Sequence, residues 1–245
     1  MRASFLLLFL ILVTPAVAMA QARPAPRFRA AINLGVQASD TTLSQSFSTT
    51  KNFEATPIVV SASLKRGVWF DAGVLVRLAG RVGVAASVSN LSRTESADVT
   101  ARLPHPFFFN QPRSVAGAAP LRHRETALHF QGSVLVRSSR RFDITVTGGP
   151  SIFSVAQNLV TDVTYTEEYP FDVAAFASAA STRVTRTVSG FNAGADATWR
   201  LSPRFGVGAL VRYTRASTTL AVSQENSTNL DVGGIQVGGG LRLGL

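Results

Sequence analysis

Few residues in this sequence have the chemistry of a catalytic or metal-binding site. There are three histidines, His105, His123 and His129, and no cysteine, so thiol nucleophiles, disulfides and iron–sulfur clusters are excluded. No two histidines have the H-x-H or H-x₃-H spacing that would bring two imidazoles to one metal ion. The sequence therefore predicts no metal site, no cofactor and no enzymatic activity, with His129 a hydrogen-bonded interior residue.

One alternative involves His123, in the segment Arg122-His123-Arg124-Glu125. A histidine and a glutamate, with a serine from elsewhere in the chain, are the components of a hydrolase triad. Sequence spacing alone cannot test such a triad. A lipid-modifying hydrolase therefore stays open as a minor hypothesis.

The most distinctive segment runs from Pro104 to Arg113 and holds Phe107, Phe108 and Phe109 among three prolines. Three consecutive rings cannot all be buried on one side of an extended chain. The segment is either a lid that packs over the end of the domain or an exposed patch that contacts lipid or a partner.

Two other segments have a plainer explanation. Thr164 to Ser181 contains Glu167, Glu168, Tyr169 and Asp172, and we interpret it as a solvated acidic loop rather than a divalent-cation site bridging to lipopolysaccharide. The glycines between Gly233 and Gly240 do not form a nucleotide-binding loop, because neither a helical pattern nor a Lys-Ser/Thr pair follows them.

The formal net charge is +10, and Lys51 and Lys65 are the only lysines. The arginines are spread singly along the chain instead of forming a basic run with interleaved aromatics, so nucleic-acid binding is not predicted. We expect them to form ion pairs inside the fold and contacts with anionic lipid headgroups.

The N-terminus has the features of an export signal. Arg2 precedes an unbroken apolar run from Phe5 to Val13, and Ala18-Met19-Ala20 is an A-x-A cleavage site. We predict a cleaved signal peptide over residues 1–20 and a short periplasmic lead over residues 21–27. A single domain then covers residues 28–245.

That domain shows period-2 alternation in eight blocks and almost no helical periodicity. The block Val68 to Leu78, for example, places Val, Phe, Ala and Leu on one face and Trp69, Asp71, Gly73 and Arg77 on the other. The alternation loses its phase around Gly148-Gly149-Pro150, which predicts a bulge or bend there. No apolar stretch long enough for a spanning helix follows residue 20, so a membrane crossing requires a closed barrel.

The connections between blocks alternate in length. They are short at Ala79-Gly80, at Ser138 to Arg141 and at Ser202 to Arg204, and long after the first, third, fifth and seventh blocks. Short periplasmic turns and long external loops are typical of outer-membrane barrels. We therefore predict an eight-stranded antiparallel up-and-down transmembrane β-barrel with four long extracellular loops.

A soluble barrel would have the same alternation but would place many Lys and Glu on its polar face. Here the polar face carries Gly, Ser, Thr, Asn and isolated charges, which suit the confined lumen of a small barrel. We expect the charges of lumen phase to form an internal ion-pair network: Asp71, Arg77, Arg81, Asp143, Asp196, Arg200, Arg212 and Arg242.

Two further features indicate the same orientation. An aromatic girdle is predicted near the periplasmic strand ends from Phe28, Phe142, Trp199 and Phe205. The C-terminal pattern of Gly240, Leu243 and Leu245 is similar to the terminal signal read by the outer-membrane assembly machinery, although that signal usually ends in an aromatic residue.

With the strand segments RVGVAASVS (residues 81–89) and FGVGALVRY (residues 205–213), these features resemble the outer-membrane β-barrel domain family, the small OmpA-like barrels, over residues 28–245. The resemblance implies an outer-membrane protein of a diderm bacterium with a structural or surface-interaction role. Its expected partners are outer-membrane lipids, lipopolysaccharide and the assembly machinery, and its extracellular ligand is unknown. The alternative of small-solute or hydrophobic-ligand transport, through the lumen or a lateral gap near Gly148 to Pro150, stays open.

Overall fold

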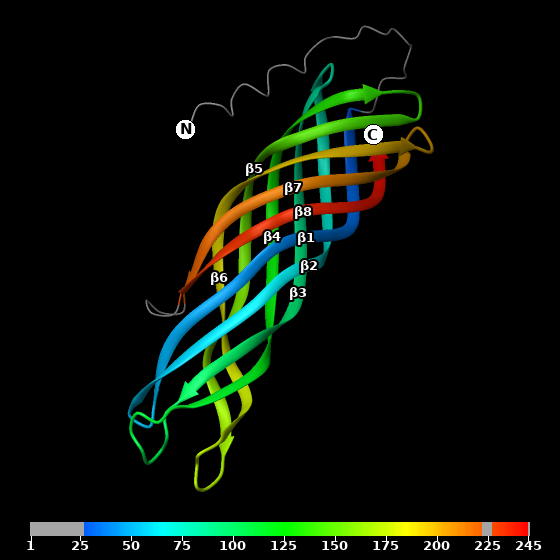
Figure 1. Cartoon of the computed structure of the whole chain (residues 1–245). Coiled ribbons are helices and arrows are strands. Elements are labelled where there is room, and N and C mark those ends of the chain that lie inside the picture. Colours follow the sequence, from blue (N-terminus) through cyan, green and yellow to red (C-terminus); the bar gives the residue numbers. More distant parts are fainter. Residues whose placement is uncertain (1–26, 222–226, 245) are drawn as a thin grey trace, which may run out of the picture.

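The computed structural model describes residues 27–221 and 227–244, so the predicted signal peptide, most of the lead and Leu245 lie outside the described residues. The described chain is built from antiparallel β-strands (Figure 1). The strands are β1 (Phe28–Lys51), β2 (Glu54–Ala79), β3 (Val82–Leu103), β4 (Arg113–Ser138), β5 (Phe142–Glu167), β6 (Ala174–Arg200), β7 (Phe205–Ala221) and β8 (Ser227–Gly244). Among these residues, no helix has the length and apolar character needed to cross a membrane.

Each strand pairs with its neighbour in the sequence, and β8 pairs with β1 to close the ring. The closing ladder runs from Arg29 opposite Gly244 to Ala38 opposite Ile235. The predicted all-β, antiparallel closed barrel is thus confirmed.

The two ends of the barrel differ. The connections 80–81, 139–141 and 201–204 lie at one end, together with the start of β1 and the end of β8 (Figure 1). We call this the short-turn end. The connections 52–53, 104–112 and 168–173 lie at the far end, which we call the distal tip.

The prediction of long loops after alternate strands is largely wrong, because most of those residues are strand. The first such segment continues β1 and β2 as a hairpin that turns at Asn52 and Phe53, both with positive φ. Likewise, most of Thr164 to Ser181 belongs to β5 and β6. These segments contain many Thr and Val residues, whose β-branched side chains favour strands.

Side-chain burial divides the barrel into two zones along its axis. In the zone next to the short-turn end, the outward side chains are apolar and the inward ones polar. We call this zone the apolar belt; it consists of residues 28–38, 68–79, 82–89, 128–138, 142–152, 191–200, 205–213 and 235–244. In the remaining zone, which we call the extension, the inward side chains are mainly apolar and the outward ones mainly polar.

Strand β3 shows the exchange most simply, because its alternation of buried and exposed residues continues from end to end. Its outer face carries Val84 and Val88 in the belt, then changes to Asn, Ser, Thr, Asp and Arg. Its inner face changes in the opposite sense, from Ser87 and Ser89 to Ala97 and Val99. The chemistry of the two faces is therefore exchanged without any change in which positions point inward.

The extension is held together by an apolar core that includes Leu43, Ile58, Leu121, Phe153 and Leu220. Its strands are not all paired around the ring: the β6–β7 ladder stops at Phe191 and Arg215, and the β4–β5 ladder stops at His123 and Gln157. Packing across the interior replaces these ladders. The ring of Phe176 on β6, for example, fills the space beside Gly117 on β4.

The bulge predicted around Gly148-Gly149-Pro150 is wrong. The register between β5 and β6 runs unbroken from Phe142 to Val160, and the first irregularity follows Val160. Pro150 has no N–H to donate. The ladder toward β4 is interrupted between Gly148 and Ser151, whereas Pro150 keeps its place opposite Phe191 in the ladder with β6. The apparent loss of phase has another cause: Ile152 faces outward in the belt, whereas Phe153 faces inward at the start of the apolar core.

The seam between β1 and β8 depends on a close backbone approach at Gly240. A Cβ atom at this position would lie 1.7 Å from the carbonyl oxygen of Ile32 on β1. The neighbouring Gly239 faces outward, and a Cβ there would come no nearer than 3.4 Å to the carbonyl oxygen of Gly208.

We therefore expect Gly240→Ala to prevent closure of the barrel, whereas Gly239→Ala closes normally. The measurement is refolding from urea into detergent micelles, with the folded form recognised by its altered electrophoretic mobility when the sample is not heated. No assembly factor is present in this assay, so a loss of the folded form reports the clash between the added Cβ and the backbone of β1. Normal folding of Gly240→Ala would contradict the conclusion that the seam between β1 and β8 requires glycine at this position.

Candidate functional site

The lumen of the belt is organised around Arg212 on β7. Its guanidinium donates to the Asp71 carboxylate at 3.0 Å, to the Ser87 hydroxyl at 2.9 Å and to the Gln236 side-chain oxygen at 2.7 Å. Its guanidinium carbon lies 5.5 Å from the centre of the Trp69 ring. Arg212 is almost fully buried, and these contacts satisfy the charge in a confined interior.

Hydrogen bonds continue from this centre across the barrel. The Gln236 amide donates to Gln37 at 2.7 Å, and the Gln37 amide donates to the Glu125 carboxylate at 3.1 Å. Glu125 lies 2.7 Å from His123 Nε2, and His123 Nδ1 lies 2.7 Å from the Gln157 side chain. A connected polar network thus links β8, β1, β4 and β5 through the lumen.

A second group of ion pairs lies nearer the short-turn end. Asp196 contacts Arg242 at 2.5 Å and Arg29 at 3.3 Å, and it also accepts a hydrogen bond from Thr198. Between the neighbouring strands β5 and β6, Arg200 contacts Asp143 at 2.7 Å. Each aspartate therefore faces at least one guanidinium.

The structure brings most of the residues predicted for the lumen network together, with one exception. Arg81 is exposed in the turn between β2 and β3, so its assignment to the lumen is wrong; the alternating phase ends before the turn begins. Arg77 lines the mouth of the lumen at the short-turn end. Sequence reasoning did not assign Arg29 or Glu125 to this network, although both share the lumen phase of their strands.

The interior changes from polar to apolar at Arg93 on β3. Both terminal nitrogens of Arg93 donate to the Ser39 hydroxyl at 3.2 Å, and Ser39 donates to the backbone oxygen of Leu64. Burial lowers the pKa of Arg93 below its ordinary value, and the nearby carboxylates of Glu125 and Glu95 oppose this shift. Arg93 thus lies between the lumen network and the apolar core.

Among the described residues, neither His123 nor His129 contacts both a serine and a carboxylate, as a hydrolase triad requires. His123 is fully buried in the lumen rather than at an outer surface, and its ring nitrogens contact Glu125 and Gln157 rather than a serine. His129 lies between the hydroxyls of Ser89 at 3.0 Å and Ser151 at 2.8 Å, without a carboxylate on the ring. Among the described residues, no group of His, Asp and Glu side chains is arranged to hold a metal ion.

Aromatic side chains are exposed at the distal tip. Phe107, Phe108 and Phe109 are between 54% and 71% exposed, and Phe53 is 95% exposed. The Phe107 ring lies 5.5 Å from that of Phe171 in the β5–β6 connection. The three consecutive rings therefore do not enter the barrel.

Arg113 joins two of the tip connections. Its guanidinium contacts the Glu167 carboxylate at 2.5 Å and donates to the backbone oxygens of Phe171 and Pro104. Glu167 is therefore paired within the protein, and Asp172 is directed toward His105 at 3.8 Å. The predicted acidic loop thus contributes to the structure of the tip.

The residues predicted for the girdle lie on the outer face at the short-turn end. Trp199 and Phe205 are more than half exposed, Phe28 and Phe142 are half-buried, and the Phe142 and Trp199 rings are 6.3 Å apart. Of the residues of the C-terminal pattern, Gly240 faces the lumen, Leu243 faces outward and Leu245 lies outside the described residues.

Comparison of the sequence with known protein families and with curated proteins finds no match. The structure is similar to the outer membrane protein OprG from Pseudomonas aeruginosa, with a TM-score of 0.52 and 10% identity over 93% of this chain and 99% of that chain. Matches with lower TM-scores include the outer membrane protease OmpT from Escherichia coli (0.47; 8% identity, covering 89% and 96%) and Ail of Yersinia pestis in complex with a heparin analogue (0.38; 11% identity, covering 88% and 99%). The similarity to OprG shows a shared fold.

The lumen network yields a test of stability. Asp71→Asn leaves the charge of Arg212 unpaired in the interior, so we expect the free energy of unfolding to fall by about 3 kcal/mol. The exposed pair of Arg215 and Asp231, 3.9 Å apart, offers a matched control. Asp231→Asn should cost less than about 0.5 kcal/mol. Urea unfolding followed by tryptophan fluorescence measures both, and equal effects would contradict the central role of the Asp71–Arg212 pair.

Proposed function

We propose that this chain is an integral outer-membrane β-barrel protein of a diderm bacterium, with a structural and surface-interaction role. The observation that carries the proposal is the exchange of the two faces along the strands. In the belt, Val, Leu, Ile and Phe side chains are exposed all around the barrel. So large an apolar surface is stable only against lipid or another apolar partner.

The dimensions of the belt support this proposal. Each strand contributes about ten residues to it, the length that a tilted strand needs to cross the hydrocarbon core of a bilayer. The polar interior is also typical of a transmembrane barrel. The aromatic side chains at the short-turn end would then lie at the level of the headgroups.

The extension has the opposite design and suits an aqueous environment. Its apolar core is inside and its polar side chains face outward, as in a soluble β-protein. It continues β5 and β6 well beyond the belt, to Glu167 and Ala174, a distance of up to roughly 50 Å along the strand. In the proposed orientation, the short-turn end faces the periplasm and the distal tip projects outside the cell.

Four exposed arginines lie in the extension, within a few residues of the belt. They are Arg66, Arg122, Arg124 and Arg215. In this orientation they lie at the level of the outer-leaflet phosphates, so contact with lipopolysaccharide is part of the proposal. The aromatic tip, including Phe107 to Phe109, is the proposed contact surface for an external partner.

The lumen favours this role over transport. The network from Arg212 to His123 crosses it with hydrogen bonds of 2.7 to 3.1 Å. The strands are also in contact at the position considered for a lateral gap, since a Cβ on Gly149 would lie 2.2 Å from the carbonyl oxygen of Phe130.

The two tryptophans test whether the belt lies in lipid. Trp199 is half-exposed on the outer face of the belt, whereas Trp69 is buried in the lumen at 1% exposure. In vesicles of brominated phosphatidylcholine, Trp69→Phe, which retains Trp199, should show fluorescence quenching several-fold stronger than Trp199→Phe. Folding of both variants is checked by electrophoretic mobility. Weak quenching of Trp199 in the folded protein would overturn the placement of the belt.

Single cysteines test the orientation, because the chain contains no cysteine of its own. On intact cells, a membrane-impermeant maleimide should label Phe109→Cys at the distal tip and leave Arg140→Cys at the short-turn end unlabelled. Arg140→Cys should react once the outer membrane is permeabilised. The reverse pattern would show that the extension faces the periplasm.

A further inference from the structure

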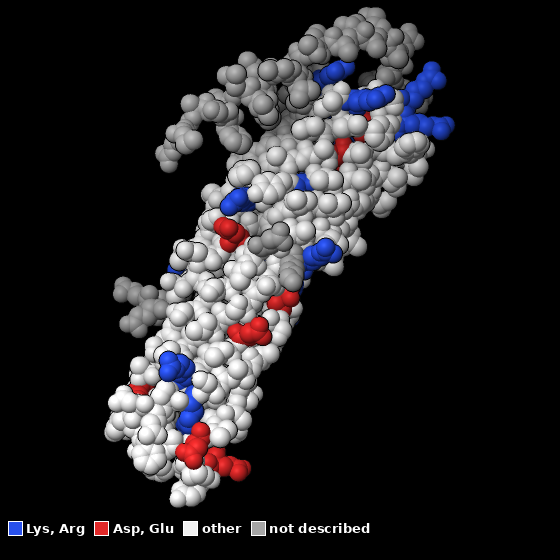
Figure 2. All heavy atoms as spheres, viewed as in Figure 1, with Lys and Arg blue, Asp and Glu red and all other residues white. Residues whose placement is uncertain are grey.

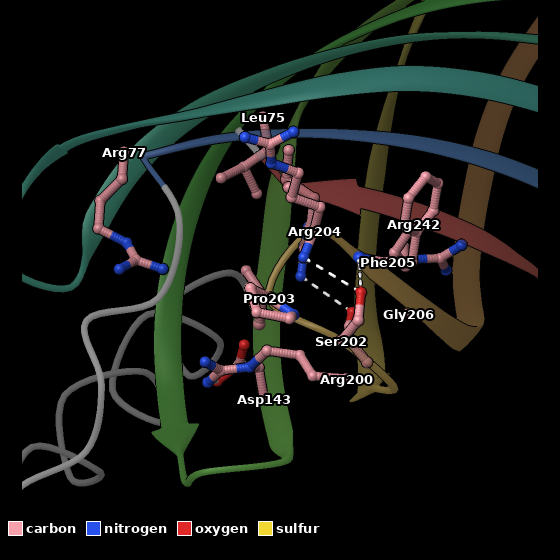
Figure 3. A pocket seen from close by; sticks show the side chains of 14 residues that line it. Leu75, Arg77, Asp143, Arg200, Ser202, Pro203, Arg204, Phe205, Gly206 and Arg242 are labelled. Atoms are coloured by element: carbon pink, nitrogen blue, oxygen red, sulfur yellow. Dashed lines mark hydrogen bonds and ion pairs between the residues drawn. The ribbon is translucent and has the colours of Figure 1, made fainter.

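A pocket opens at the short-turn end of the lumen, and arginines dominate its wall (Figure 3). The space between its side chains, open to the solvent, measures about 450 Å³. Its lining includes Arg29 from β1, Arg77 from β2, Arg200 from β6, Arg204 from the β6–β7 turn and Arg242 from β8. Five arginines from separate segments thus line one opening.

The carboxylates near this pocket do not balance its charge. Asp143 is engaged by Arg200, and Asp196 is shared by Arg242 and Arg29. The Arg204 guanidinium forms neither an ion pair nor a hydrogen bond with any described residue. With both carboxylates ionised, five guanidiniums face two carboxylates, so the lining of the pocket has an excess of positive charge that attracts anions.

One donor in this pocket also lacks a partner. The Nε atom of Arg200 is buried and has no hydrogen-bond partner among the described residues. One terminal nitrogen of the same guanidinium, Nη2, is already used, because it donates to Asp143, Ser138 and the backbone oxygen of Ser139. Arg200 therefore retains donor capacity beyond its contacts with Asp143, Ser138 and Ser139.

We propose that this pocket binds a phosphate group, presented by the headgroup of an anionic phospholipid or as a free anion. Guanidinium groups bind phosphate through paired, charge-assisted hydrogen bonds, and several of them around one opening suit an anion with several acceptor oxygens. This inference rests on the proposed function, since a headgroup reaches the pocket only if the belt lies in a bilayer.

The distribution of charge over the molecule supports this assignment. At the short-turn end, comprising residues 27–29, 77–81, 137–143, 196–206 and 242–244, ten arginines face only two carboxylates. The arginines are Arg27, Arg29, Arg77, Arg81, Arg137, Arg140, Arg141, Arg200, Arg204 and Arg242, and the carboxylates are Asp143 and Asp196. Basic side chains gather at this end in Figure 2, whereas both signs are interspersed over the extension. The end of the barrel is thus an attractive surface for anions, with the pocket at its centre.

The test measures lipid binding by the full chain folded in detergent, using native mass spectrometry with phosphatidylglycerol and phosphatidylcholine as probes. We expect a preference of about tenfold or more for phosphatidylglycerol. Arg77→Gln/Arg204→Gln should abolish this preference. The matched control, Arg140→Gln/Arg141→Gln, removes the same charge from the same end but outside the pocket, and it should retain the preference.

Competition with inorganic phosphate at constant ionic strength distinguishes the two possible sources of the phosphate group, a lipid headgroup and a free anion. If phosphate displaces phosphatidylglycerol only weakly, the headgroup is the ligand; if it displaces the lipid fully at low concentration, the site takes the free anion. Equal losses in the two double variants would show a general surface effect and overturn the proposal, as would absence of any preference in the wild type. Failure of the proposed function has a different signature, namely weak quenching of Trp199 in the vesicle experiment.

Discussion

The aspartates and arginines inside this narrow barrel must neutralise one another, because an unpaired charge in so confined an interior is costly. The lumen has room for side chains but little for water, so each buried aspartate must face a guanidinium. Asp71 faces Arg212, Asp143 faces Arg200, and Asp196 faces both Arg242 and Arg29. These pairs connect strands that are far apart in the sequence. They also neutralise the aspartates of the polar interior while the outer face is apolar.

The second organising feature is the exchange of the two faces between belt and extension. A strand has a period of two residues in any environment, so the same backbone can place apolar groups outside in one zone and inside in the next. Strand β3 does so without a change of phase. Arg93 and Ser39 lie at the boundary and bond to one another, so the polar lumen ends in a layer of hydrogen bonds against the apolar core.

Because the polar and apolar faces are exchanged between belt and extension, each part of the barrel has a different proposed role. The belt provides a surface for lipid, the arginines beyond it a surface for phosphates of the outer leaflet, and the distal tip a group of aromatic side chains held by Arg113. At the opposite end, the arginine pocket is the proposed site for a phosphate group. The apolar core of the extension gives the tip a rigid support, because packing across the interior replaces the ladders that end at His123 and Phe191.

Period-2 alternation and short turns are local properties of the chain, so they were sufficient to predict the closed antiparallel barrel, the apolar outer face of the belt and the lumen phase of most charges. The tertiary structure alone shows which partners meet, such as Arg29 with Asp196 or Gln37 with Glu125, since each pair joins distant segments. It also decided that the supposed long loops are strands. The inward residues of these strands are apolar and the outward ones polar. This is the reverse of the pattern expected of a strand that faces lipid, so the strands were interpreted as loops. The phase change near Pro150 was likewise visible in the sequence, but its cause, the start of an apolar interior at Phe153, depends on what surrounds the strand.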